Sequence, residues 1–93
     1  MAKLDPLLHQ ELRLSIISFL ATIDSADFKK LMEVTGASKG NLSTQISKLK
    51  TANYLTVNKT FKNNYPLTTC AITAEGRAAL DQYIKDLKAL LNL

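Results

Sequence analysis

Residues 38–52 constrain the fold of this chain more than any other stretch, because they combine an apolar stripe at helical spacing with polar groups on every other side. Leu42, Ile46 and Leu49 follow one another at spacings of four and three, which puts them on one face of an α-helix. The remaining side chains are mostly basic or hydrogen-bonding, and several are mediocre helix formers. The stretch therefore predicts a helix that packs on a core through one face and presents polar groups on the others.

Two other amphipathic segments precede this helix. Residues 6–22 carry apolar side chains at helical spacing, and Asp5 before a proline is a helix-start signal. A polar link at 24–27 leads to a second helix, for which Ser25 is the expected N-terminal cap. Gly36 can adopt the left-handed conformation that ends a helix. The pattern predicts a helix, a turn and a further helix in close succession.

A hairpin is predicted directly after the polar-sided helix. Ser38 is expected to cap that helix, and Asn53 is expected to end it, since Asn is the best substitute for glycine in a left-handed cap. Residues 54–60 and 68–72 have the composition of strands, and a polar connection at 61–67 separates them. The result is a β-hairpin with an exposed basic tip.

Residues 74–93 are predicted to form a long last helix, capped by Thr73. Apolar residues recur along it at spacings of three and four, which is typical of a stripe that meets a partner helix. The stripe could instead complete the core of a monomer, and both interpretations stay open at this point. We expect the interface of a homodimer, formed by Leu80, Tyr83, Leu87, Leu90 and Leu91.

Charge is distributed unevenly along the chain. The net charge is +4, yet no Asp or Glu lies between Glu33 and Glu75. Because five lysines fall within this acid-free stretch, the rest of the chain has a net charge of −1. A positive field confined to the middle of a chain predicts a polyanionic partner. The lysines of the acid-free stretch are Lys39, Lys48, Lys50, Lys59 and Lys62.

The polar side of the helix at 38–52 has the side chains needed to read duplex DNA. The major groove admits one α-helix, and its base edges carry distinct patterns of donors and acceptors. Asn41 and Gln45 can each pair bidentately with adenine, and Lys39 can donate to guanine. The expected DNA-binding residues are Ser38, Lys39, Asn41, Ser43, Thr44, Gln45 and Lys48 on the helix, with Lys59 and Lys62 on the hairpin.

Two other interpretations compete with DNA reading. The polar side could be an ordinary solvated helix face, but such a face usually mixes both signs of charge. The chain could also be a protein-interaction module, for which an apolar exposed surface is expected; this surface carries Lys, Asn, Ser, Thr and Gln instead. Sequence-specific binding of double-stranded DNA is therefore the preferred hypothesis.

Several short motifs resemble one known family in their order and spacing. They are Gly-Asn-Leu-Ser at 40–43, Ala-Asn-Tyr-Leu at 52–55, Pro66 with Thr68, and Thr-Ala-Glu-Gly-Arg-Ala-Ala at 73–79. This succession is similar to that of the winged helix DNA-binding domains related to the MarR-like and ArsR-like regulators. The likeness covers nearly the whole chain.

The resemblance implies a mainly α fold with a small β-hairpin (α+β), a winged helix-turn-helix with a three-helix core and a long C-terminal helix. It implies a recognition helix at about 38–52, a wing at about 54–72 and a dimerisation helix at about 74–93. It further implies a transcriptional regulator, often a repressor, that acts as a homodimer. Lys39 and Gln45 stand where the family commonly has an acidic residue and a histidine, which predicts a different choice of bases.

Few residues could carry catalysis, metal binding or redox chemistry. Cys70 is the single cysteine and is expected to be a small buried hydrophobe, with oxidation sensing as the alternative. His9 is the single histidine and has no nucleophile or carboxylate at a recognisable spacing. We therefore expect no enzymatic activity, no metal and no cofactor.

A chain of 93 residues is expected to form one domain, 1–93. Its sequence contains neither a basic N-terminal region followed by an apolar run nor eighteen successive apolar residues. We therefore expect no membrane segment and a cytoplasmic location. A small-molecule effector bound in a dimer cleft is left open.

Overall fold

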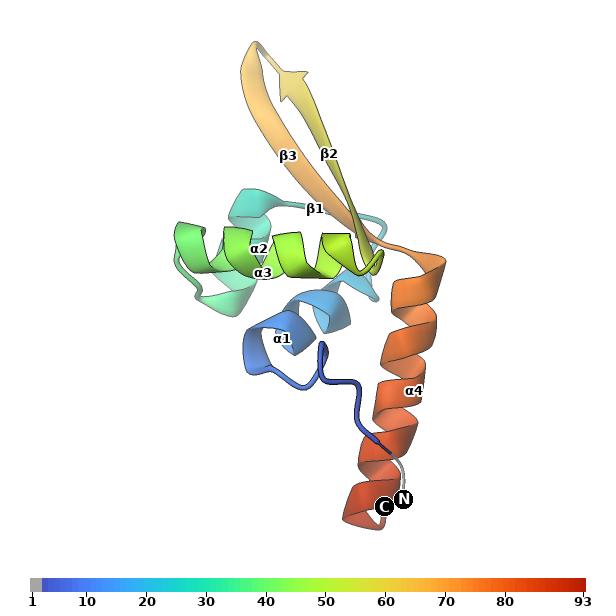
Figure 1. Ribbon diagram of the computed structural model, residues 1–93. Helices are drawn as coiled ribbons and strands as arrows, with labels where there is room; N and C mark the ends of the chain where they lie inside the picture. Colours follow the sequence, from blue (N-terminus) through green and yellow to red (C-terminus); the bar gives the residue numbers. More distant parts are fainter. Residues whose placement is uncertain (1–2) are drawn as a thin grey trace.

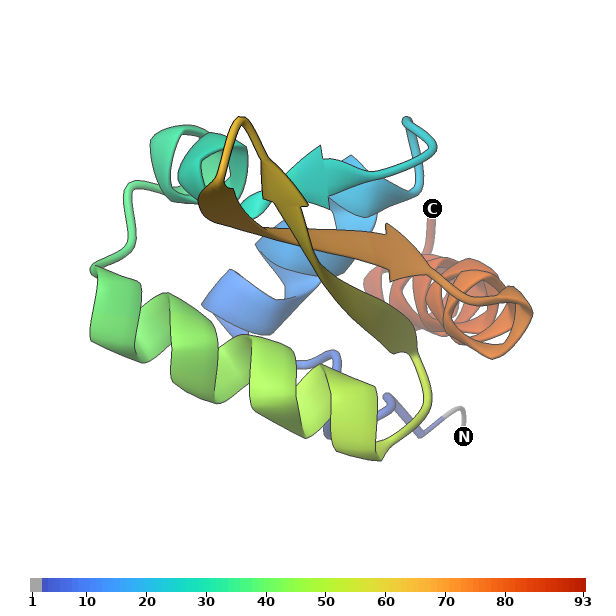
Figure 2. The ribbon, with the colours of Figure 1, turned by 90° about the horizontal axis from the view of Figure 1, so that it is seen from above.

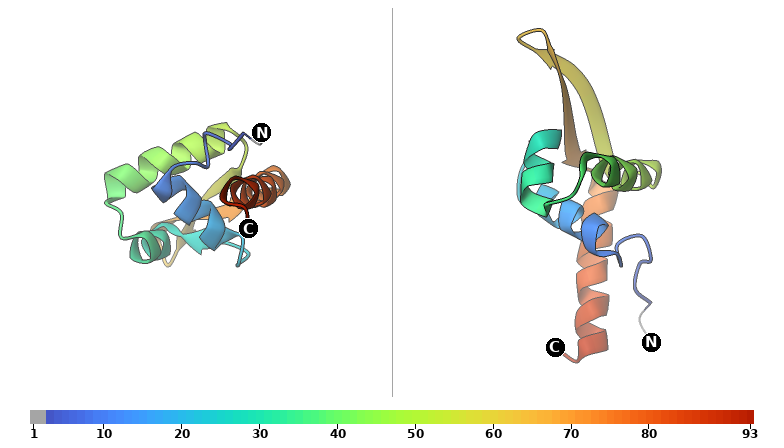
Figure 3. Two further views of the ribbon diagram at one scale, coloured as in Figure 1. Left: turned by 90° about the horizontal axis from the view of Figure 1, so that it is seen from below. Right: turned by 90° about the vertical axis from the view of Figure 1, so that its left-hand side faces the viewer.

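Residues 3–93 are described by the computed structural model, in which three helices, a hairpin and a long last helix follow one another (Figure 1). The first three helices pack together, the hairpin rises on one side of them, and the last helix extends in the opposite direction (Figures 1 and 3). This confirms the predicted α+β arrangement of the chain. The elements are α1 (Glu11–Leu20), β1 (Ala26–Asp27), α2 (Phe28–Thr35), α3 (Lys39–Thr51), β2 (Leu55–Lys62), β3 (Tyr65–Ile72) and α4 (Ala74–Leu91).

The apolar face predicted for the third helix packs into the core. Leu42 and Leu49 have no exposed surface, and Ile46 is 5% exposed. Burying one such side chain stabilises a fold by about 1.5–3 kcal/mol, so three of them hold α3 firmly on the core. The fully buried side chains of the core are Leu8, Ile16, Ile17, Leu20, Leu31, Leu42, Leu49, Leu55 and Cys70.

Four of the predicted helix boundaries are confirmed by backbone geometry. Ser38 caps α3, where its Oγ accepts a hydrogen bond from the amide of Asn41 at 3.2 Å. Thr73 caps α4 in the same way. Gly36 and Asn53 follow α2 and α3 with φ of 71° and 65°, the left-handed conformation that ends a helix.

The first helix begins at Glu11 rather than at Pro6, and Gln10 caps it instead of Asp5. Asp5 still caps backbone amides, but it does so in a separate turn, where its Oδ1 accepts from the amide of Leu7 at 2.9 Å. The predicted start was wrong because this turn uses the proline and the aspartate to close itself and does not continue into the helix.

The second helix is capped by Asp27 and not by Ser25, as Asp27 Oδ1 accepts from the amide of Lys30 at 2.7 Å. The preceding link, predicted to be a loop, contains the short strand β1. Ala26 of β1 lies opposite Cys70 of β3 in the antiparallel sheet, whose strand order is β1-β3-β2. A two-residue strand has too little sequence pattern to be recognised before its partner is known.

The hairpin is longer than predicted because its turn is only two residues long. Asn63 and Asn64 have φ of 53° and 67°, and Asn is one of the few residues besides glycine that tolerates this conformation. Two successive positive φ values make the tight turn whose twist matches that of the flanking strands. Pairing therefore extends to Lys62 and Tyr65, within the segment 61–67 that the sequence predicts to be a connection.

The last helix packs on the core through its first half and leaves it in its second half (Figure 1). Leu80 and Tyr83 are 6% and 3% exposed, and Tyr83 Oη lies 2.9 Å from Nδ1 of His9. The expectation that Leu80 and Tyr83 form an exposed interface is wrong, because the chain's own core covers both. Leu90 and Leu91 are 51% and 55% exposed. Among residues 3–93, no helix has the length and apolar character needed to cross a bilayer.

Candidate nucleic-acid interface

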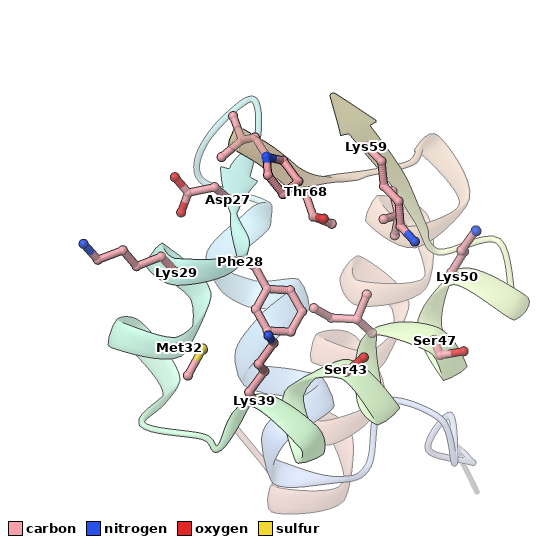
Figure 4. Close-up of a pocket in the computed structure, with 14 residues that line it drawn as sticks. Asp27, Phe28, Lys29, Met32, Lys39, Ser43, Ser47, Lys50, Lys59 and Thr68 are labelled. Atoms are coloured by element: carbon pink, nitrogen blue, oxygen red, sulfur yellow. The ribbon is translucent and has the colours of Figure 1, made fainter. Parts of the chain in front are cut away.

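A lysine-rimmed cleft of about 760 Å³ lies between α2, α3 and the hairpin (Figure 4). Seen from above, the hairpin lies over the space between the two helices (Figure 2). The apolar part of its lining consists of Phe28, Met32, Ile46, Val57, Pro66 and Leu67, and the basic part consists of Lys29, Lys39, Lys50 and Lys59.

The charge of the cleft is strongly one-sided. Asp27 is the single carboxylate in its lining, and Oδ1 of that carboxylate is already engaged with a backbone amide at the start of α2. Four ammonium groups around a groove with low-dielectric walls concentrate positive potential. The cleft is therefore suited to a polyanion such as the phosphodiester backbone.

The lysines predicted on the hairpin lie on its two different faces. Lys59 pairs with Thr68, and it shares a face with Val57, which packs against the core. Lys62 pairs with Tyr65 at the tip, and strand alternation turns it to the opposite face. Both are exposed, as expected, but the structure brings only Lys59 of the two into the cleft.

On α3 the predicted residues divide between two sides of the helix. Lys39 and Ser43 line the cleft, whereas Asn41 lines a smaller pocket beside α1. Lys48 is seven residues beyond Asn41 and so lies on the same side of the helix. Thr44 is exposed and donates its hydroxyl to the carbonyl of Gly40 at 3.0 Å.

Gln45 is not on the exposed side, and the expectation that it offers both amide groups to adenine is wrong. Its side chain is 9% exposed, and its Oε1 accepts from Nη1 of Arg13 at 2.6 Å. Its Nε2 donates to Oδ1 of Asn41 at 3.1 Å. The spacing contained the signal, because Gln45 follows Leu42 by three residues and precedes Leu49 by four, as a member of the apolar stripe would.

The cleft contains polar residues outside the expected DNA-binding set, among them Ser47 and Lys29. Ser47 lies four residues after Ser43, so helical spacing alone could have placed it on the same side. Lys29 comes from α2, outside the acid-free stretch, and it reaches the cleft because α2 packs beside α3. No local pattern marked Lys29, since its role depends on the angle between two helices.

The structure also shows the surroundings of Cys70 and of the side chains that could bind a metal ion. Cys70 is 1% exposed, and burial raises the pKa of its thiol to about 11. This confirms the prediction of a small buried hydrophobe. Among residues 3–93, no three His, Cys, Asp or Glu side chains are grouped so that they could hold a metal ion.

Comparison with solved structures finds the same fold in transcriptional regulators. A transcriptional regulator homologue from Pyrococcus horikoshii OT3 superposes with a TM-score of 0.86 at 27% identity, over 92% of this chain and 85% of that chain. The transcriptional regulator MOSR of M. tuberculosis, solved in complex with DNA, has a TM-score of 0.73 at 15% identity, over 92% of this chain and 61% of that one.

A MarR-family transcriptional regulator from Silicibacter pomeroyi has a TM-score of 0.71 at 16% identity, over 89% of this chain and 55% of that chain. The present chain thus spans little more than half the length of these last two proteins. No curated protein matches this chain. The family profile described as a winged helix DNA-binding domain matches residues 12–91, which include all of α2, α3 and the hairpin. The chain therefore belongs to the winged helix DNA-binding domain family, and its structural neighbours include a MarR-family transcriptional regulator.

Proposed function

We propose that this protein is a sequence-specific, double-stranded DNA-binding transcriptional regulator that acts as a homodimer and represses transcription. The observation that carries the proposal is the lysine-rimmed cleft beside α3, most of whose lining residues come from the stretch 34–74, which contains no carboxylate. A helix with polar exposed sides fits the major groove in shape, and the basic groove beside it is complementary in charge to the DNA phosphates.

The elements of the site divide the work of DNA binding. The exposed side of α3 enters the major groove, where its exposed polar side chains meet base edges. These side chains are Lys39, Asn41, Ser43 and Thr44. The rest of the cleft, with Lys29, Lys50 and Lys59 in its lining, lies against the sugar-phosphate backbone that separates this groove from the next. Lys62, at the tip of the hairpin, contacts the backbone or the adjacent minor groove. Backbone contacts hold the protein in register, while base contacts select the sequence.

The homodimer is proposed to form through the second half of α4. Ile84, Leu90 and Leu91 are 41%, 51% and 55% exposed, and Leu87 is half-buried between them and the core. A second copy of the same helix would cover these side chains by a two-fold contact. Such pairing places two recognition helices on successive turns of the duplex, about 34 Å apart. The proposed interface therefore retains Leu87, Leu90 and Leu91 of the predicted set.

In this proposal, the protein represses transcription by occupying its binding site on the duplex. A dimer seated across two successive major grooves excludes other proteins from that stretch of duplex. In a reconstituted transcription reaction, a promoter that carries the selected binding site should therefore be silenced as the protein is added. An increase in transcript would contradict repression while leaving DNA binding intact.

The decisive experiment is selection of bound duplexes from a random DNA pool by the whole protein. We expect a two-fold symmetric motif whose half-sites lie one helical turn apart. Binding of this motif should weaken steeply with salt, because each neutralised phosphate releases counterion. Failure to enrich any motif, together with duplex binding no tighter than that of a neutral protein, would rule the function out.

Lys59 and Lys85 make a matched pair of variants for the backbone contacts. Lys59→Ala removes a cleft lysine and should weaken specific and random duplexes alike, reducing the slope of log K against log salt by about 1. Lys85→Ala removes a charge that is also exposed but lies on α4, away from the cleft, and should leave that slope unchanged. Equal slopes for the two variants would remove the cleft from the interface.

A further inference from the structure

A chain of three hydrogen-bonded side chains runs from α1 to the exposed side of α3. Arg13 on α1 donates through Nη1 to Oε1 of Gln45 at 2.6 Å, and Nε2 of Gln45 donates to Oδ1 of Asn41 at 3.1 Å. Arg13 is itself held by a bond from its Nε to the carbonyl of Leu7 at 2.7 Å. We call the three side chains of Arg13, Gln45 and Asn41 the amide relay. α1 lies against the inner side of α3 in all views, which is why the relay can cross between them (Figures 1 and 3).

Arg13 determines which way the amide groups of Gln45 and Asn41 are turned in the relay. A guanidinium can only donate hydrogen bonds, so Gln45 must turn its oxygen toward Arg13. The NH₂ group of Gln45 then faces Asn41, which must present its own oxygen to accept. Because Gln45 is 9% exposed and both ends of its amide are hydrogen-bonded, turning the amide over would break both bonds. The outward group of Asn41 is therefore the NH₂ group, which is a pure donor.

We propose that Asn41 is a donor-only contact to DNA and that Arg13 is the positioning residue that makes it so. The proposal rests on the proposed function of DNA reading and specifies what the site reads. A fixed donor selects base edges that carry acceptors: guanine offers N7 and O6, adenine N7, and thymine O4. Cytosine offers only the N4 donor in the major groove, so the NH₂ group of Asn41 finds no acceptor there and cytosine is disfavoured. Guanine should therefore be preferred over cytosine where Asn41 meets the duplex.

This assignment replaces the bidentate adenine contact expected for Asn41 from the sequence. Bidentate pairing with adenine needs a donor and an acceptor on the same amide. In the relay, the acceptor of Asn41 is engaged within the protein by Gln45. The exposed side chain of Asn41 keeps its place on α3, while its hydrogen-bonding character is set through Gln45 by Arg13, which lies 32 residues before Gln45 in the chain.

The test is to reverse the relay with Gln45→Glu. A carboxylate at this position still accepts from Arg13 and gains a charge-assisted bond, so the fold should be retained. Its second oxygen cannot donate to Asn41, which must then turn its NH₂ group inward and its oxygen outward. Selection from a random duplex pool should show the preference at one base position of each half-site moving from guanine to cytosine or adenine. A change of about 10-fold in the ratio of guanine to cytosine is expected from one gained and one lost contact.

Two further variants separate this effect from charge and from folding. Thr51→Glu adds the same negative charge to the exposed end of α3 without touching the relay, so it should weaken all duplexes and change no base preference. Gln45→Met keeps the length of the side chain but breaks the relay, so Asn41 can turn freely and should lose discrimination at that position. Thermal unfolding of each variant shows whether it folds. If Gln45→Glu does not fold, the inference is tested by whether Gln45→Met loses the base preference at that position.

The outcomes distinguish this inference from the proposed function. The relay is supported if the selected motif differs from that of the wild type at one base position in Gln45→Glu and shows no base preference at that position in Gln45→Met. The same motif in the wild type and in both variants overturns the relay while leaving DNA reading in place. A merely structural role of Arg13 and Gln45 would lower the melting temperature without moving a base preference. If the wild type selects no motif, the function and the inference fall together.

Discussion

Tyr54 joins the N-terminal segment to the start of the wing. Its hydroxyl donates to Oδ2 of Asp5 at 2.6 Å, across 49 residues of sequence. This hydrogen bond, together with partial burial and the negative charge of Asp5, raises the pKa of Tyr54 to about 12. The neutral phenol is thus favoured by the folded state, because only the neutral form can donate to the carboxylate.

The raised pKa of Tyr54 predicts a loss of stability in strong base. Since the pKa is higher in the folded than in the unfolded chain, its contribution is complete below about pH 10 and is lost as pH rises toward 12. Tyr54→Phe should flatten this part of the pH profile and lower the free energy of unfolding at neutral pH by about 1 kcal/mol, because the bond is partly screened by solvent. Urea denaturation at a series of pH values measures both effects. Equal slopes above pH 10 in the two proteins would contradict this account.

Cys70 occupies the middle strand of the sheet, opposite Ala26 on one side and Val57 on the other. Its thiol is buried and its pKa is raised to about 11, so little thiolate exists near neutral pH. We predict that a thiol reagent modifies Cys70 only as fast as the protein unfolds. Labelling rates measured with increasing urea should therefore follow the unfolding equilibrium. Fast labelling of the native protein would restore the alternative that Cys70 senses oxidation.

At the scale of the elements, the junction between the wing and α4 depends on close backbone contact. Gly76 lies in the first turn of α4, and a Cβ atom there would collide with the carbonyl of Tyr54, which accepts from the amide of Thr73 at 3.0 Å. Backbone atoms cannot move aside as a flexible side chain can. This close approach sets where α4 departs from the base of the hairpin.

Two glycines should therefore respond in opposite directions to the same substitution. Gly76→Ala should lower the free energy of unfolding by about 1–3 kcal/mol, as expected for overpacking at a rigid site. Gly40→Ala should raise it by about 0.5–1 kcal/mol, because Gly40 is helical and a Cβ there meets open space. Chemical denaturation of the two variants provides the measurement. A stabilised Gly76→Ala would show that α4 can shift along the hairpin at little cost.

The molecule as a whole is elongated, with extents of 51 × 25 × 21 Å, because the hairpin and α4 project in opposite directions. The two projections differ: the cleft beside the hairpin has four lysines in its lining, whereas the second half of α4 exposes Ile84, Leu90 and Leu91. The proposed DNA-binding surface and the proposed dimer interface therefore lie toward opposite ends of the molecule.

The self-association surface can be tested by charging it. Ile84 and Leu91 are seven residues apart and share one side of α4, so the double variant Ile84→Asp/Leu91→Asp should convert a dimer to a monomer. Ala89→Asp is the matched control, since Ala89 lies about half a turn away from Leu87 on the helix. Sedimentation equilibrium gives the mass of each protein. A wild type that stays monomeric at high concentration would refute the homodimer.

Local spacing was sufficient for much of the fold. Helical periodicity predicted the buried face of α3, and the capping residues Ser38 and Thr73 marked two helix starts. The acid-free stretch indicated which part of the surface attracts a polyanion. These features are readable because each depends on residues within one or two turns of one another, where geometry is nearly the same in every helix.

Tertiary contacts decided what local spacing left open. Gln45 turned inward because Arg13, on another helix, donates to it. Tyr83 belongs to the core cluster, and its hydroxyl lies within hydrogen-bond distance of His9 in the N-terminal segment. Lys29 joined the cleft only through the packing of α2 beside α3. The amino-acid sequence alone therefore determined which side of each helix is polar. Which polar groups remain free for a partner was determined by elements distant in the chain, since a hydrogen bond between helices depends on their relative position and leaves no trace in the spacing of either one.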